Sequence, residues 1–198
     1  MTFLPDPEVD ATVQAMYDGD RAQMGFVMNL SGVWGHLPDA HRRVMEQLGA
    51  TAEVAGLSFR DRGILIIATA STIGDSYCSL AWSRKLTDAA GVDLVRAVLA
   101  GDEGPLDARE RALASWARKV AGSPGSTTAA DVDELRAAGF DDAQVVAVTA
   151  FVAQRMAFST VNAALGAAPD AQFDEVLAPD VRAAITWGRP VAAQPSTT

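Results

Sequence analysis

The sequence is poor in the residues that most often carry metal and redox chemistry. Its 198 residues include one cysteine, Cys78, and two histidines, His36 and His41. A single cysteine permits no disulfide within the chain, and no cysteine–histidine cluster has the spacing of a zinc site. We therefore expect neither a metal site nor a bound cofactor.

Positive charge is also scarce, and long apolar runs are missing. The formal net charge is −9, and the basic residues form no run, so the surface repels phosphate backbones and anionic lipid headgroups. The longest apolar stretch, ILIIATA at 64–70, is too short to span a bilayer. The N-terminus, MTFLPDPEVD, lacks the features of a secretory signal. These absences predict a cytoplasmic protein with no nucleic-acid and no membrane partner.

The sequence is rich in segments whose apolar residues recur at helical spacing. Segment 106–120 carries one apolar face, segment 141–166 is apolar on most sides, and 64–70 is apolar all round. A buried strand is the competing interpretation of 64–70, because short Ile-rich runs occur in both structures. Ser58 and Asp75 are the expected N-caps of two successive helices. No linker divides the chain. The pattern predicts a single all-α domain over residues 1–188 and a disordered polar tail over 189–198.

The order of these segments resembles the AhpD-like fold of the carboxymuconolactone decarboxylase and alkylhydroperoxidase superfamily, in its peroxidase-related branch. Three parts of the chain carry the resemblance, from about residue 10 to residue 170. They are MNLSGVWGHLP, LSFRDRGILIIATASTIGDSYC, and the pair LDARERALASWARKV and DELRAAGFDDAQVVAV. The resemblance implies an all-helical AhpD-like domain that assembles into a homo-oligomer.

The catalytic motif of that family is a Glu, a C-x-x-C pair and a His. One thiolate attacks a peroxide, the second thiol resolves the sulfenic acid as a disulfide, and Glu and His move protons. Laid over this sequence, Cys78 takes the second cysteine position and Asp75 the first. Trp82 stands at the His position and Gly63 at the Glu position. The resemblance therefore implies the fold without the two-cysteine peroxidase activity.

Cys78 has three possible roles: a buried and inert apolar residue, a lone peroxidatic thiol with an external resolving thiol, or a pocket residue that does not react. The charge of Asp75, one turn earlier, raises the pKa of a thiol at this position. No basic residue in the first turn offsets that charge, and Lys85 is expected to face elsewhere. We expect a thiol that is mostly protonated at neutral pH.

Each residue near Cys78 in the alignment also has two interpretations, one structural and one functional. Asp75, Cys78 and Trp82 share one helical face. Asp75 is either the helix N-cap or a general base in an apolar pocket, and Trp82 is either core or an aromatic wall for a flat ligand. Gly63 allows either a close helix contact or room for a ligand.

Three further residues are ambiguous. His36 lies in a turn, where it either caps or faces solvent, or acts as a weak candidate acid or base. His41 is expected at a solvated helix position. Arg155 interrupts an apolar helix and needs a buried partner or a cavity.

The function that these features favour is a rebuilt AhpD-like site that binds or transforms a small organic molecule by proton transfer, as a lyase- or isomerase-like enzyme. One alternative is a one-cysteine peroxidase, and another is a non-catalytic structural or regulatory homologue. The catalytic candidates are Asp75, Cys78 and His36, and the pocket candidates are Gly63, Tyr77 and Trp82.

Overall fold

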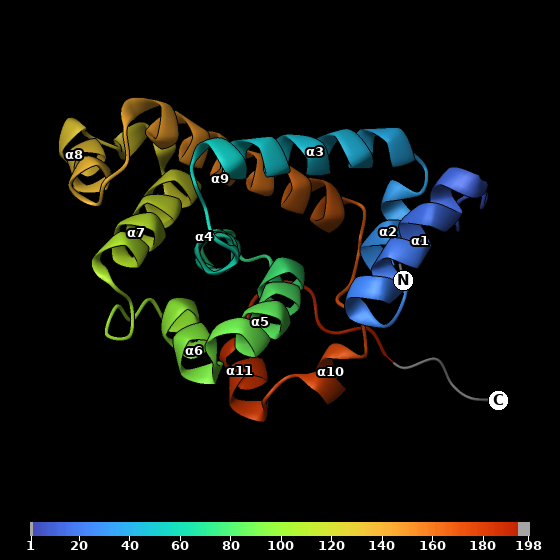
Figure 1. Cartoon of the computed structure of the whole chain (residues 1–198). Helices are drawn as coiled ribbons and strands as arrows, with labels where there is room; N and C mark the ends of the chain where they lie inside the picture. The colour runs from blue at the N-terminus through green and yellow to red at the C-terminus, as the bar shows by residue number, and fades with distance from the viewer. Residues whose placement is uncertain (1, 194–198) are drawn as a thin grey trace.

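The computed structural model describes residues 2–193, which form eleven α-helices, one 3-10 turn and no β-strand. The predicted all-α architecture is confirmed (Figure 1). The helices are α1 (Ala11–Met24), α2 (Asn29–Trp34), α3 (Pro38–Val54), α4 (Phe59–Ile73), α5 (Ser76–Ala90), α6 (Val92–Ala100), α7 (Ala108–Gly122), α8 (Ala129–Ala137), α9 (Asp142–Ala164), α10 (Phe173–Val176) and α11 (Pro179–Ala184).

Short polar side chains set the starts of the longer helices. Ser58 and Asp61 form a capping box at the start of α4, and the same reciprocal pairing begins α7, α8 and α9. Gly74 ends α4 in the left-handed conformation, with φ 72°, and Asp75 follows at once as the N-cap of α5. The chain thus turns from α4 into α5 within two residues, and both predicted N-caps are confirmed.

Helix α4 lies at the centre of the fold. Its five consecutive residues from Ile64 to Ala68 are each at most 2% exposed. Figure 1 shows α4 end-on, surrounded by its neighbours, and it packs on α5, α6, α7 and α9. A helix that is apolar all round has to be covered on every side, so its sequence dictates this central position.

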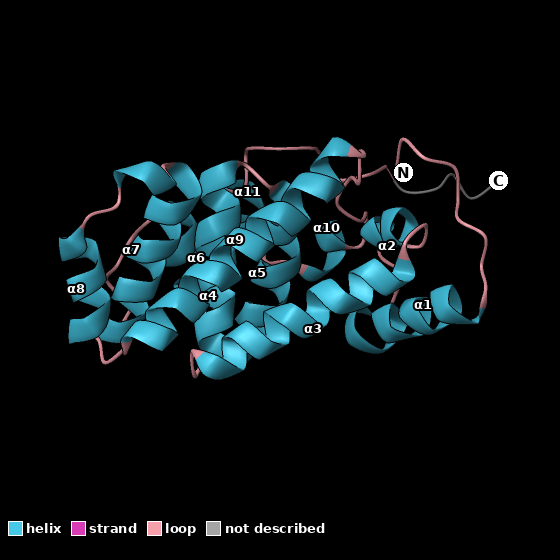
Figure 2. Cartoon of the chain, turned by 90° about the horizontal axis from the view of Figure 1, so that it is seen from above, coloured by secondary structure: helices cyan, strands magenta, loops and turns pink. Residues whose placement is uncertain are grey.

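Helix α9 is long and apolar enough, by length and composition, to cross a membrane. It packs instead on α3, α4 and α7, and Figure 2 shows it within the helical layer. Val148, Phe151 and Val152 are at most 3% exposed. In this structure α9 is a core helix.

The C-terminal segment is packed as far as it is described. The Ser76 hydroxyl donates to the carbonyl of Arg189 at 2.7 Å, and the Ala192 N–H donates to the carbonyl of Pro169 at 2.8 Å. Segment 189–193, within the tail expected to be disordered, thus bonds to the start of α5 and to the loop before α10. Residues 194–198 of that tail lie outside the described residues.

Gly63 marks a close approach of α4 to α5. A Cβ at this position would lie 2.8 Å from Cδ1 of Leu86, which is fully buried. We expect Gly63→Ala to lower the free energy of unfolding by about 1–3 kcal/mol, because the buried side chain has to move. Chemical denaturation measures this change.

The matched control is Gly49→Ala in α3, where nothing lies within 4 Å of the added Cβ. This variant should be stabilised by about 0.5–1 kcal/mol through helix propensity alone. A stabilisation of the same size in Gly63→Ala would contradict the close contact.

Candidate functional site

The first turn of α5 brings two predicted site residues into contact. Asp75 Oδ1 accepts a hydrogen bond from the Cys78 N–H at 3.1 Å, so Asp75 caps the helix. Asp75 Oδ2 is buried and has no hydrogen-bond partner among the described residues. One oxygen of this carboxylate is therefore structural, and the other is available for chemistry.

The Cys78 sulfur is buried between α5 and α9. The side chain is 2% exposed, and Sγ lies 3.2 Å from Nη2 of Arg155 and 3.6 Å from Oγ of Ser159. Burial, and then the charge of Asp75, raise the pKa of Cys78 to about 12, against the smaller opposing effects of Arg155 and Ser159. The thiol is protonated at neutral pH as expected, although burial contributes more than Asp75 does.

Asn162 is a site residue that the sequence analysis missed. The Trp34 indole donates to Asn162 Oδ1 at 2.8 Å, which fixes the orientation of the amide. Asn162 Nδ2 is then left buried without a partner among the described residues. The one signal of this residue in the sequence is an amide side chain within an otherwise apolar helix, because a buried amide needs a hydrogen-bond partner.

A pocket of about 230 Å³ opens beside the start of α5. Its volume is below the ~300–1,000 Å³ of pockets for drug-sized ligands, so it admits only a small molecule. The two unpartnered groups, on Asp75 and Asn162, belong to residues of its wall. The lining residues are Gly74, Asp75, Ser76, Tyr77, Asn162, Ala163, Ala167, Gly188 and Arg189.

Tyr77 is held in place on the wall of this pocket. Its hydroxyl donates to Asp170 Oδ2 and accepts from the Leu30 N–H at 3.2 Å, while Asp170 Oδ1 accepts from the Asn29 N–H at 2.8 Å. Burial raises the pKa of Asp170 to about 6 and raises that of Tyr77 as well. With its hydroxyl bonded in this way, Tyr77 shapes the wall and is not a free acid or base.

The other three predicted residues lie away from the pocket. Gly63 faces Leu86, as described above. Trp82 is half-buried one turn beyond Cys78, under the Lys85 ammonium. His36 is exposed, and its Nε2 lies 3.0 Å from the carbonyl oxygen of Pro5. The structure therefore does not bring these side chains together with Asp75.

His41 departs from its expected solvated position. Its ring is half-buried, 5.6 Å from the Trp34 ring and 6.1 Å from the Phe158 ring. Burial lowers its pKa, and the charge of Asp20 opposes that effect. The expectation is wrong because α3 packs along α9 and turns this residue inward.

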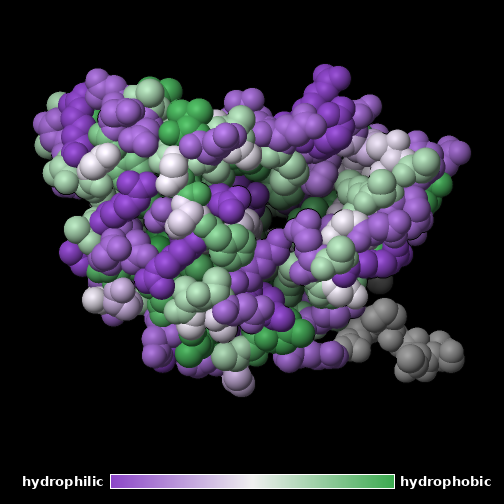
Figure 3. Space-filling model, viewed as in Figure 1, coloured by the Kyte–Doolittle hydropathy of each residue, from purple (hydrophilic) through white to green (hydrophobic). Residues whose placement is uncertain are grey.

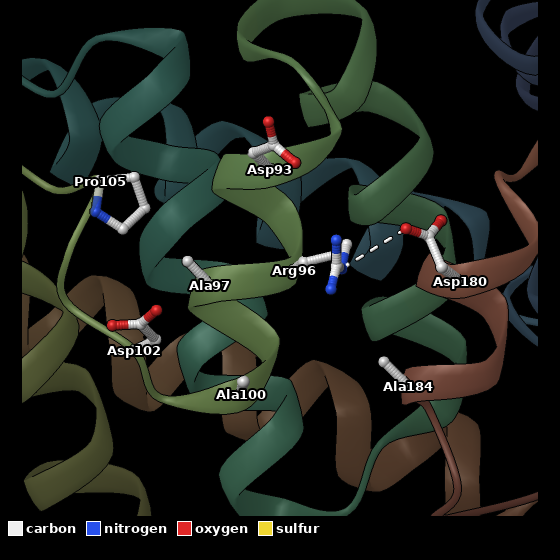
Figure 4. A pocket seen from close by; sticks show the side chains of 8 residues that line it. All are labelled: Asp93, Arg96, Ala97, Ala100, Asp102, Pro105, Asp180 and Ala184. Carbon is white, nitrogen blue, oxygen red and sulfur yellow. Dashed lines mark ion pairs between the residues drawn. The ribbon is translucent and has the colours of Figure 1, made fainter.

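A larger pocket, of about 520 Å³, lies between α6 and α11 (Figure 4). Its one cation, Arg96, pairs with Asp180 at 3.4 Å, and both side chains are about half exposed. The pocket holds none of the buried unpartnered atoms of the described chain. Within residues 2–193, no group of three or more metal-ligating side chains gathers at either pocket.

Comparison with solved structures shows the AhpD-like fold. An uncharacterized peroxidase-related protein from Ralstonia eutropha JMP134, described as an alkylhydroperoxidase AhpD core, is 22% identical with a TM-score of 0.74, over 87% of this chain and 94% of that one. A peroxidase-related protein from Silicibacter sp. TM1040 is 20% identical with a TM-score of 0.73, over 87% and 93%. The debrominase Bmp8 is 18% identical with a TM-score of 0.68, over 92% and 96%.

No family model matches the chain, and no curated protein matches it. The likeness at these identities is one of fold. The chain therefore has the AhpD-like fold, and its activity has to be argued from its own residues.

The Asp170 carboxyl predicts a pH dependence of stability. Its pKa in the folded protein, about 6, lies above the ordinary 3.8, so the folded state holds this proton more tightly than the unfolded chain. The resulting stabilisation is complete below about 3.8 and is lost as the pH rises through about 6. As the pH rises from about 3.8 to about 6, we expect the wild type to lose stability relative to Asp170→Asn.

Urea denaturation of both proteins across this pH range measures the difference. The other carboxylates contribute equally to the pH dependence of both proteins, so their effect cancels in the difference. A difference in unfolding free energy that stays constant across the range would contradict the raised pKa of Asp170.

Proposed function

We propose that this protein binds a small organic molecule in the pocket beside the start of α5 and transfers a proton with Asp75. A single observation carries the proposal. A buried carboxylate oxygen and a buried amide N–H group, both without partners among the described residues, belong to two residues that line one small pocket. Buried polar groups are nearly always hydrogen-bonded, so this pair indicates a ligand that supplies the missing partners.

The two groups fit the two needs of proton abstraction next to a carbonyl. Asp75 Oδ2 accepts the proton from carbon, and the electron pair of the broken C–H bond moves onto the adjacent carbonyl oxygen. Asn162 Nδ2 donates a hydrogen bond to the negative charge that develops on that oxygen. The Asp75 carboxyl then returns the proton to the same or a neighbouring carbon, so the reaction needs no oxidant and no cofactor.

The surrounding contacts hold both groups in position. The Asp75 side chain is fixed by its other oxygen, which caps α5, and the Asn162 amide is fixed by Trp34. A base and a donor that are oriented before the ligand arrives lose little entropy in the reaction. The backbone of 188–189 closes the pocket against the first turn of α5, since a Cβ on Gly188 would lie 2.8 Å from the Ser76 nitrogen.

A one-cysteine peroxidase is less well supported than proton transfer. Peroxide reduction needs a thiolate that the peroxide can reach. Cys78 is 2% exposed, and its pKa is raised to about 12. The same fold occurs in proteins described as peroxidase-related and as a debrominase, so the fold itself does not favour one chemistry over another.

Three further features are proposals that rest on the sequence and its family resemblance. They are a small-molecule partner, assembly into a homo-oligomer and a cytoplasmic location. Of these, the pocket beside Asp75 and Asn162 supports the first directly.

The test uses NMR to measure how fast carbon-bound hydrogen exchanges with solvent deuterium. The substrates are a panel of small ketones, lactones and keto acids. We expect the protein to catalyse exchange in a member of this panel. Asp75→Asn should lower the rate by a factor of about 10² or more, because general base catalysis contributes about 10²–10⁴. Asparagine caps helices about as well as aspartate, so α5 should stay intact.

Asp107→Asn is the matched control, since Asp107 caps α7 in the same way and lies outside the pocket. This variant should keep the wild-type exchange rate. Exchange that survives in Asp75→Asn would contradict the assigned base. A wild-type protein that exchanges no member of the panel would favour the non-catalytic alternative.

A further inference from the structure

Arg155 is a buried cation without an acidic partner. Its side chain is 6% exposed and lies over the Phe158 ring, 5.1 Å from the centroid. One nitrogen, Nη2, contacts the Cys78 sulfur, while Nε is buried with no hydrogen-bond partner, and no described carboxylate pairs with the guanidinium. A buried charge in this position is unfavourable unless an anion compensates it.

Lys85 is a second cation in the neighbourhood of Cys78 and Arg155. Its Nζ donates to the Gln23 amide oxygen at 3.3 Å and lies 5.4 Å from the Trp82 ring centroid. Burial, and then the positive charge of Arg155, lower the pKa of Lys85. The two cations are therefore close enough to repel one another, and no acid of the described chain forms an ion pair with Lys85.

The acidic groups around these cations are engaged elsewhere. Asp20 of α1 raises the pKa of Lys85 from a distance, but Asp20 Oδ2 accepts from the Met28 N–H at 3.0 Å. Asp75 is committed to the first turn of α5. His41 of α3 supplies no negative charge. Neither acid forms an ion pair with Arg155 or Lys85, although the charge of Asp20 reaches Lys85.

The surface is hollowed on this side of the molecule. Figure 3 shows a hollow between the edge that carries α3 and the lobe that carries α1. Helices α5 and α9, which supply Lys85 and Arg155, lie around the same region in Figure 1. Each cation is accompanied by an aromatic ring, Trp82 for Lys85 and Phe158 for Arg155.

We propose that Arg155 and Lys85 bind the carboxylate of a small, flat organic acid that enters through this hollow. The Arg155 Nε–H and the Lys85 ammonium donate to the carboxylate oxygens, because charge-assisted hydrogen bonds of this kind are the strongest that the site can offer. The half-buried Trp82 ring contacts the apolar body of the acid. This site is separate from the pocket at Asp75 and does not rest on the proton transfer proposed there.

The probe is benzoate, with benzamide as its uncharged counterpart of the same shape, and binding is measured by calorimetry on the full chain. Benzoate has no acidic C–H next to a carbonyl, so the proton transfer proposed at Asp75 cannot act on it, and the Lys85 variant below assigns its binding to this site. We expect saturable binding of benzoate, and binding of benzamide weaker by at least about tenfold, as the loss of a charged hydrogen bond predicts.

The diagnostic variant is Lys85→Met, which keeps the length of the side chain and removes its charge. It should weaken benzoate binding by at least about tenfold. The chain has one other lysine, Lys119, which pairs with Asp131 in α8, and Lys119→Met should bind benzoate as the wild type does. Benzoate should also protect Lys85, and not Lys119, from an amine-acylating reagent, as mass spectrometry would show.

Three results would overturn the proposal. They are the absence of benzoate binding at millimolar concentration, equal binding of benzoate and benzamide, and unchanged binding in Lys85→Met. Arg155→Gln is a second variant that should lose binding. Because this substitution removes a buried charge, its folding is checked by circular dichroism, and Lys85→Met decides the outcome if it fails to fold.

Discussion

The burial of Arg155 against an uncharged thiol is the constraint on which the rest of the site depends. A guanidinium in the core normally meets a carboxylate, yet here its closest polar neighbour is the Cys78 sulfur. The nearby Asp75 does not reach it, because one of its oxygens caps α5 and the other has no partner. Charges of opposite sign therefore flank one neutral sulfur without meeting, and each leaves an unsatisfied atom that a ligand can bind.

Helices α5 and α9 meet at a polar contact, in which the Cys78 sulfur lies against Arg155 and Ser159 of α9. Asp75, the N-cap of α5, and Asn162 of α9 belong to the wall of the small pocket. The proposed carboxylate site uses Arg155 of α9 and Lys85 of α5. The proposed acid–base and anion-binding sites therefore draw on the same pair of helices.

Local features of this structure could be predicted from the sequence, and features that depend on packing could not. Ser58 and Asp75 were identifiable as N-caps because capping needs only neighbouring residues, and the all-round apolar run of α4 indicated a central helix. The inward turn of His41 depends on how α3 lies along α9. The partner of Arg155 lies 77 residues away in the chain, which no local pattern records. For the same reason the role of Asn162 became visible only beside Trp34 and the pocket.

The most direct test is a pH titration of Cys78 in the folded protein. Thiolate absorbance in the ultraviolet reports the ionisation, and Cys78→Ser gives the baseline. The chain has one thiol, so the signal belongs to a single site. We expect no ionisation through neutral and moderately alkaline pH, because burial and the charge of Asp75 raise the pKa of Cys78 to about 12. A thiolate that forms near neutral pH would mean that Cys78 itself neutralises Arg155. That result would remove the need for an external anion and would restore a reactive-cysteine function.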